Sequence, residues 1–156
     1  MRPPSPEMLI EALAEALQTM AFICPEPAEG GAPAPAASDR LSVRWSGAGG
    51  SGGELQLATT RQFGELLAAS ILALEPGTVE AAQRAVDALK ELCNITTGSL
   101  LARLSETPDD APEMGLPAAA VLADAAAWRD FVAQPHTAVL LAEGQPLAVR
   151  LEEARV

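Results

Sequence analysis

The longest helix-like segment of the chain, residues 79–104, is the feature that most limits what this sequence can fold into. Thr78 is a suitable N-cap for it, and Pro76 and Gly77 separate it from the preceding segment. Apolar side chains recur within it at intervals of three and four residues, which is the spacing of one helix face. We expect this long helix to pack on a sheet through that stripe, which consists of Val79, Ala82, Val86, Leu89, Cys93, Thr96 and Leu100.

Shorter patterns predict the sheet and three further helices. Alternation of apolar and polar residues indicates two hairpins, one around a Gly-rich turn and one around Glu143-Gly144. Residues 25–38, rich in Pro, Ala and Gly, are expected to form a mobile loop that only connects. The order of elements predicts a single α+β domain over residues 1–156, with long helices packed on a largely antiparallel β-sheet. The predicted strands are 41–46, 55–59, 116–122, 137–142 and 145–151, and the shorter helices are 7–22, 61–74 and 123–133.

The charge of the chain disfavours several classes of partner. The formal net charge is −11, and the basic residues are a single Lys and nine scattered Arg. A nucleic-acid backbone would be repelled, and no basic patch is available for an anionic membrane. The longest apolar run, residues 66–74, is too short to cross a bilayer. We therefore expect a cytoplasmic protein that binds neither nucleic acid nor membrane.

Common catalytic and metal-binding patterns find little support in the sequence. His136 is the only histidine, so a nucleophilic triad would have no other histidine base. Cys24 and Cys93 lack the spacing of zinc ligands, and we expect two reduced thiols and no metal site. The sequence GAGGSGG lacks the Lys that follows in a phosphate-binding loop, so it is better interpreted as the tip of a hairpin.

One polar face of the long helix carries residues that helix stability alone does not explain. At about 100° per residue, Asp87, Glu91, Asn94 and Gly98 fall within roughly 60° of one another, opposite the apolar stripe. Asn94 is the only Asn of the chain, and a glycine such as Gly98 costs about 1 kcal/mol in a helix interior. A glycine here would let another macromolecule approach closely. A solvated face that tolerates both residues is the alternative interpretation.

The spacing of these residues resembles the pattern of the CheC/CheX/FliY phosphatases. That pattern is Asp or Ser, three residues, Glu, two residues, Asn, twenty-two residues and Pro, and this sequence has Asp87, Glu91, Asn94 and Pro117 at those separations. Gly98 also follows the Asn as in the family. The order of predicted elements is similar to the single-site CheX type, so the resemblance covers most of the chain and implies a CheC-like fold.

The resemblance implies an enzyme that hydrolyses the aspartyl phosphate of a CheY-like response-regulator receiver domain. Asn94 would orient the attacking water, and Glu91 would dock to the active-site Lys of the receiver. Asp87 and Gly98 would lie in the contact with the partner, and Pro117 would be structural. The chain would need no cofactor of its own, because the receiver supplies Mg²⁺ and most of the rate comes from positioning and electrostatics.

Two other functions stay open at this point. The chain could be a catalytically silent CheX-like module that binds receivers or scaffolds a signalling complex. It could also be a structural protein similar to those of the flagellar switch, although no additional assembly domain is evident.

The resemblance also bears on the number of sites and on association. The first predicted helix has Glu15 and Gln18 in place of a second Glu and Asn pair, which implies one active ridge per chain. CheX-type proteins tend to be dimers, and the last predicted strand, 145–151, would offer a sheet edge. We therefore expect a homodimer.

Overall fold

The structure is a computed structural model that describes residues 4–28 and 32–154. Its α-helices are α1 (Pro6–Ala21), α2 (Arg61–Leu72), α3 (Val79–Leu104) and α4 (Ala125–Val132). Its strands are β1 (Glu26–Pro27), β2 (Ser38–Ser46), β3 (Gly52–Thr59), β4 (Glu113–Met114), β5 (Ala118–Leu122), β6 (Thr137–Ala142) and β7 (Gln145–Glu153). Short 3₁₀ turns span Ala48–Gly50 and Pro108–Asp110.

The strands form one sheet in the order β1-β6-β7-β3-β2-β4, and β5 also pairs with β2. All of the pairings are antiparallel. In the middle of the sheet, Leu57 of β3 lies opposite Leu41 of β2 on one side and Val149 of β7 on the other. The prediction of an α+β fold with a largely antiparallel sheet is therefore confirmed.

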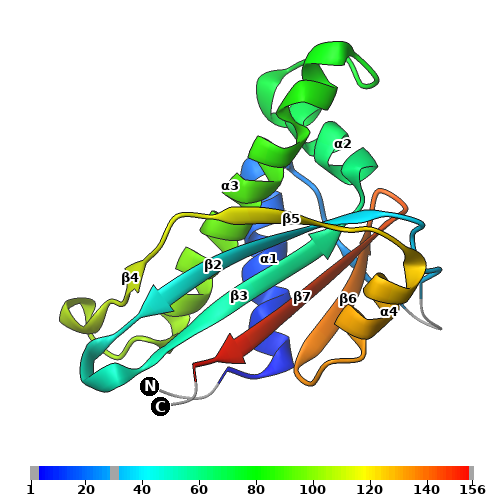
Figure 1. Cartoon of the computed structure of the whole chain (residues 1–156). Coiled ribbons are helices and arrows are strands. Elements are labelled where there is room, and N and C mark those ends of the chain that lie inside the picture. The colour runs from blue at the N-terminus through cyan, green and yellow to red at the C-terminus, as the bar shows by residue number, and fades with distance from the viewer. Residues whose placement is uncertain (1–3, 29–31, 155–156) are drawn as a thin grey trace.

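Helices cover the two faces of the sheet unequally. Figure 1 shows α1 and α3 side by side behind the sheet and α4 in front of it. The main core lies between the sheet and the α1 and α3 helices, with fully buried side chains such as Leu13, Leu57 and Leu89. A smaller core lies under α4 on the opposite face and contains Ala58, Trp128, Phe131 and Ala148.

Helix α3 has the bounds that the sequence predicts, and the Oγ1 of Thr78 caps it by accepting a hydrogen bond from the backbone N–H of Ala81 (3.3 Å). Its first turns extend beyond the sheet together with α2 (Figure 1). There α2 approaches very closely: a Cβ added at Gly64 would lie 2.9 Å from Leu89 Cδ1 and 3.0 Å from the carbonyl oxygen of Ala85. Only glycine permits this helix contact without a shift of the helices.

The predicted buried stripe is wrong for the first half of α3. Val79 is 74% exposed and Ala82 is exposed, whereas Ala81 and Ala85 are completely buried. The first turns of α3 meet α2 rather than the sheet, and a close helix contact uses alanines instead of large apolar residues. From Leu89 onward the prediction and the structure agree.

Two predictions about connections and edges are also wrong. Glu26 and Pro27 form β1 and pair with Leu141 and Leu140 of β6, so the segment after α1 does more than connect. The part of the predicted loop at 29–31 lies outside the described residues. Strand β7 is paired on both sides, with β6 and β3, so it offers no sheet edge. The homodimer therefore stays a prediction without that support.

Within the described ranges 4–28 and 32–154, no helix combines the length and the apolar character needed to cross a membrane.

Candidate functional site

The outward face of α3 holds all four of the residues that the sequence singles out on this helix. Asp87 and Glu91 are exposed, and Asn94 and Gly98 are half-buried. The opposite side of the same turns is buried in the core through Leu92, Cys93, Thr96 and Leu100. The structure thus presents the carboxylates and the carboxamide together on one side of a helix whose other side is fixed. We call these four residues the α3 ridge.

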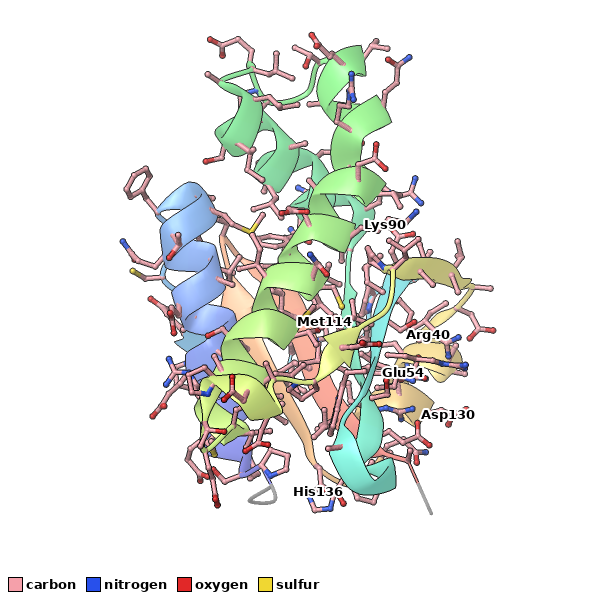
Figure 2. The ribbon with its side chains drawn as sticks, turned by 90° about the vertical axis from the view of Figure 1, so that its left-hand side faces the viewer. Arg40, Glu54, Lys90, Met114, Asp130 and His136 are labelled. Carbon is pink, nitrogen blue, oxygen red and sulfur yellow. The ribbon has the colours of Figure 1, made fainter. Side chains whose placement is uncertain are left out.

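The α3 ridge is bordered by α1 on one side and by the segment containing β4 and β5 on the other. Figure 2 shows α3 facing the viewer between these two neighbours, with Met114 on the strand side. Met114 is the nearest side chain to the missing Cβ of Gly98, at 3.8 Å from Sδ. This is an ordinary contact distance, so a methyl group would fit at Gly98. The glycine is therefore not required by the packing of this chain.

The polar groups of the α3 ridge are free to meet a partner. Across the part of the chain that the structure describes, the carboxylates of Asp87 and Glu91 are in no ion pair, and the Asn94 carboxamide is in no hydrogen bond. A carboxamide offers two N–H donors and an acceptor oxygen. All of these remain available in Asn94 for water or for an incoming ligand.

The buried side of α3 holds its polar groups within the helix. The hydroxyls of Thr96 and Thr97 donate to the carbonyl oxygens of Leu92 and Cys93, each at 2.7 Å. Because these buried hydroxyls are paired locally, they make no demand on the surroundings. The side of α3 opposite the ridge is therefore well packed in the core, and it holds the ridge residues in place.

Cys93 precedes Asn94 in the sequence but faces the core. Burial raises the pKa of its thiol to about 12, with a smaller contribution from the negative charge of Glu54. A thiol with so high a pKa is protonated at neutral pH and is a poor nucleophile. Cys93 and the exposed Cys24 are both free thiols.

Glu15 on α1, which with Gln18 stands in place of a second Glu and Asn pair, has its carboxylate engaged in hydrogen bonds. It accepts a hydrogen bond from the guanidinium of Arg103 and another from Ser99 Oγ (3.0 Å), both on α3. The Arg103 hydrogen bond, followed by that of Ser99, lowers the pKa of the Glu15 carboxyl. Gln18 accepts a hydrogen bond from Cys24 Sγ (2.8 Å). Glu15 thus ties α1 to α3, whereas Glu91 is in no ion pair within residues 4–28 and 32–154.

This pair predicts a pH-dependent difference in stability. The folded-state pKa of Glu15 lies below its ordinary value of 4.5. The pair therefore stabilises the fold at pH values above 4.5, and this stabilisation is lost as the pH falls through the folded-state pKa. Glu15→Gln should therefore lower the free energy of unfolding slightly at pH 7 and have a smaller effect at pH 3. Urea unfolding at both values tests this. The single Arg103→Gln variant should behave in the same way, and simple additivity of the two substitutions at pH 7 would contradict the pairing.

Pro117 lies directly before β5, in the gap between β4 and β5 where both pair with β2. In the same gap the backbone N–H of Gly115 donates to the carbonyl oxygen of Arg44 (2.8 Å). Pro117 therefore belongs to the segment that borders the α3 ridge and is not one of the ridge residues. Its structural role stays a prediction.

The remaining candidates are not part of this site. His136 is exposed in the turn before β6. Among residues 4–28 and 32–154, no group of three or more His, Cys, Asp or Glu side chains is arranged to hold a metal ion. The place of Met114 beside Gly98 could not be predicted from the sequence, because the two residues are far apart in the chain and nothing in their local sequence indicates the contact.

The domain is of the α+β class: α1 and α3 cover one face of an antiparallel sheet, and α3 carries an exposed polar ridge. The sequence matches no family model and no curated protein. Solved structures of chemotaxis proteins, however, share the fold over nearly the whole chain.

Three of these structures illustrate the likeness. CheX from Desulfovibrio desulfuricans has 16% identity and a TM-score of 0.66, with 95% of this chain and 97% of the other covered. A CheC-like superfamily protein from Shewanella sp. PV-4 has 14% identity and a TM-score of 0.66, with 96% of each chain covered. The complex of CheX, CheY, BeF₃ and Mg²⁺ from Borrelia burgdorferi gives 13% identity and a TM-score of 0.62, with 99% and 100% covered. The CheC-like fold predicted from the sequence is therefore confirmed.

Proposed function

We propose that this protein hydrolyses the aspartyl phosphate of a CheY-type receiver domain, using Asn94 and Glu91 on the α3 ridge. The observation that carries the proposal is that the outer face of α3 presents an exposed carboxylate together with a carboxamide that forms no hydrogen bond to any described residue. One turn further along, Gly98 has no side chain, so a partner could approach the backbone of the helix closely at this position.

The kind of partner follows from a relative with the same fold. The CheX of Borrelia burgdorferi is found in a complex with CheY, BeF₃ and Mg²⁺. Beryllium trifluoride has the shape and charge of a phosphoryl group, so that complex supports a phosphorylated receiver as the partner of this chain too. The shared fold covers α3 and both of its neighbours.

The chemistry requires a positioned water molecule. Its oxygen attacks phosphorus, the bond from phosphorus to the aspartyl oxygen breaks, and the products are the free Asp carboxylate and inorganic phosphate. The oxygen of the Asn94 carboxamide would accept a hydrogen bond from this water, while its NH₂ group would donate to a phosphoryl oxygen. The Mg²⁺ and Lys of the receiver would neutralise the charge of the phosphoryl group.

Glu91 would fix how the receiver docks. It lies three residues before Asn94, so its carboxylate stands nearly one helical turn away on the same face. A salt bridge to the receiver's active-site Lys would set the position of Asn94 relative to the phosphoryl group. Asp87 would assist from the edge of the contact.

Glu91→Ala should therefore weaken receiver binding by about tenfold and also reduce hydrolysis at saturating receiver. Titration calorimetry with a receiver carrying beryllium fluoride measures the binding, and the decay of phosphorylated receiver measures the hydrolysis. The exposed Glu80→Ala, on the first turn of α3, is the matched control and should change neither quantity by more than about twofold. Equal effects of the two substitutions would contradict the docking role.

Gly98→Ala should separate function from stability. The new methyl group fits beside Met114 and favours the helix, so the free energy of unfolding should rise by about 0.5 to 1 kcal/mol. The same methyl group should hinder close approach of a receiver and slow its dephosphorylation by about threefold or more. Thermal unfolding and the decay assay test the two effects. A more stable variant with unchanged activity would show that Gly98 has no part in docking.

The direct test of the proposal adds the purified protein to phosphorylated CheY-type receiver domains. The decay of the phosphoryl group should become faster, and substoichiometric protein should complete many turnovers. A silent receiver-binding module would bind the receiver without accelerating this decay. That result would overturn the proposed activity.

A further inference from the structure

Lys90 is the only lysine of the chain and lies on α3 beside the α3 ridge. Its side chain is half-buried, and within the described residues its ammonium group is in no ion pair or hydrogen bond. Figure 2 shows it projecting on the side of α3 that faces β5, away from α1. By contrast, Arg103, further along α3, is paired with Glu11 and Glu15. Lys90 thus places an ammonium group at the edge of the site, and no carboxylate of the described residues forms an ion pair with it.

The position of Lys90 along the helix brings this charge close to Asn94. The two residues are four apart, which is about one turn along the axis and about 40° around it. Side chains at this spacing are neighbours on a helix surface. The flexible four-carbon stem of lysine lets its ammonium group reach over the carboxamide.

The negative charge of the proposed substrate would be attracted by the ammonium group of Lys90. The chain has a formal net charge of −11, and Asp87 and Glu91 place two carboxylates on the α3 ridge. An acyl phosphate that arrives at Asn94 brings further negative charge to the same place. A cation one turn away offsets this repulsion, and the attraction strengthens as docking excludes water.

We infer that Lys90 is a substrate-contacting residue, whose ammonium group binds anionic oxygen of the docked receiver beside Asn94. The inference rests on the proposed function. Lysine binds phosphoryl oxygens as a point charge. The same chemistry suits carboxylates around the phosphorylation site of the receiver, and the experiment separates these two sources of anionic oxygen.

The experiment compares Lys90→Gln with Arg84→Gln, a matched control on the same helix. Both substitutions remove one positive charge, but the exposed Arg84 is ten residues from Asn94, about 15 Å along the axis. Affinity is measured for a CheY-type receiver that the protein dephosphorylates, with and without beryllium fluoride and Mg²⁺. We expect Lys90→Gln to weaken binding of the loaded receiver by about tenfold, Lys90→Arg to restore most of it, and Arg84→Gln to change it by less than about twofold. The effect should shrink at high salt.

The outcomes are distinguishable from a failure of the proposed function. A loss confined to the loaded receiver assigns the contact to the phosphoryl oxygens, and a loss in both forms assigns it to receiver carboxylates. Equal effects of Lys90→Gln and Arg84→Gln, or no effect of either, overturn the inference. If Lys90→Gln is silent while Asn94→Ala slows hydrolysis, the inference fails and the phosphatase proposal stands. If Asn94→Ala leaves hydrolysis unchanged, the proposed function itself has failed.

Discussion

Replacing Asn94 with Ala is expected to slow dephosphorylation of the receiver by about 100-fold or more while changing receiver affinity by less than about threefold. The carboxamide is small, half-buried and in no hydrogen bond within the described chain, so its removal costs the fold little. What is lost is the group that holds the attacking water and donates to a phosphoryl oxygen. The docking contacts of Glu91 and its neighbours remain.

The decay of phosphorylated receiver at saturating protein measures this effect, and binding of a receiver carrying beryllium fluoride measures the affinity. Gln83→Ala is the matched control, because it removes another exposed carboxamide from α3 about three turns earlier. Asn94→Asp is the conservative variant: it keeps the shape but replaces the NH₂ donor with a second acceptor, so it should also be slow. Wild-type hydrolysis in Asn94→Ala would contradict the catalytic role.

Leu89→Ala is expected to lower the free energy of unfolding by about 2 to 5 kcal/mol. Leu89 is completely buried on the inner side of α3, and it lies where α2 approaches closely at Gly64. Truncation leaves a cavity between the two helices that rigid neighbours fill only in part. Since a domain of this kind has about 5 to 15 kcal/mol of stability in total, the loss would be a large share of it.

Val79→Ala on the same helix is the control for Leu89→Ala. Val79 is 74% exposed, so its truncation should change the free energy of unfolding by less than about 0.5 kcal/mol. Equilibrium unfolding in urea measures both variants. Equal losses would mean that the first turn of α3 is buried, as the apolar periodicity predicts and the structure does not show.

The bounds and the outer face of α3 could be predicted because they depend on local physics. Pro76, Gly77 and Thr78 mark the start of the helix, and Thr78 caps it in the structure as expected. The angle between Glu91 and Asn94 is fixed once the segment is a helix, so their presentation on one face follows from spacing alone.

The features that the sequence did not predict depend on long-range contacts. The first turns of α3 turn their alanines toward α2, and the size of an apolar side chain is a poor guide to burial where two helices nearly touch at Gly64. The interior place of β7 is set by pairing with β3, which is remote in the chain. The packing of α4 on the opposite face of the sheet likewise depends on the assembled fold.

The same reason explains the neighbours of the α3 ridge. Glu15 resembles a second site in sequence spacing, but Arg103 and Ser99 reach it from α3 and engage its carboxylate. Met114 borders Gly98 only because β4 and β5 pair with β2 beside the helix. Helical geometry thus predicts which groups share a face, and the tertiary structure decides which of them stay free.

Because the chain contains a single asparagine, selective ¹⁵N-asparagine labelling gives one side-chain NH₂ signal, that of Asn94. The measurement is the change in this signal when a CheY-type receiver is added together with Mg²⁺ and beryllium fluoride. The receiver is one whose phosphorylated form the protein hydrolyses. If Asn94 contacts the phosphoryl group and its water, both NH₂ protons should shift strongly with the loaded receiver and little with the unloaded one. An NH₂ signal that stays in place while the loaded receiver is bound would contradict the account.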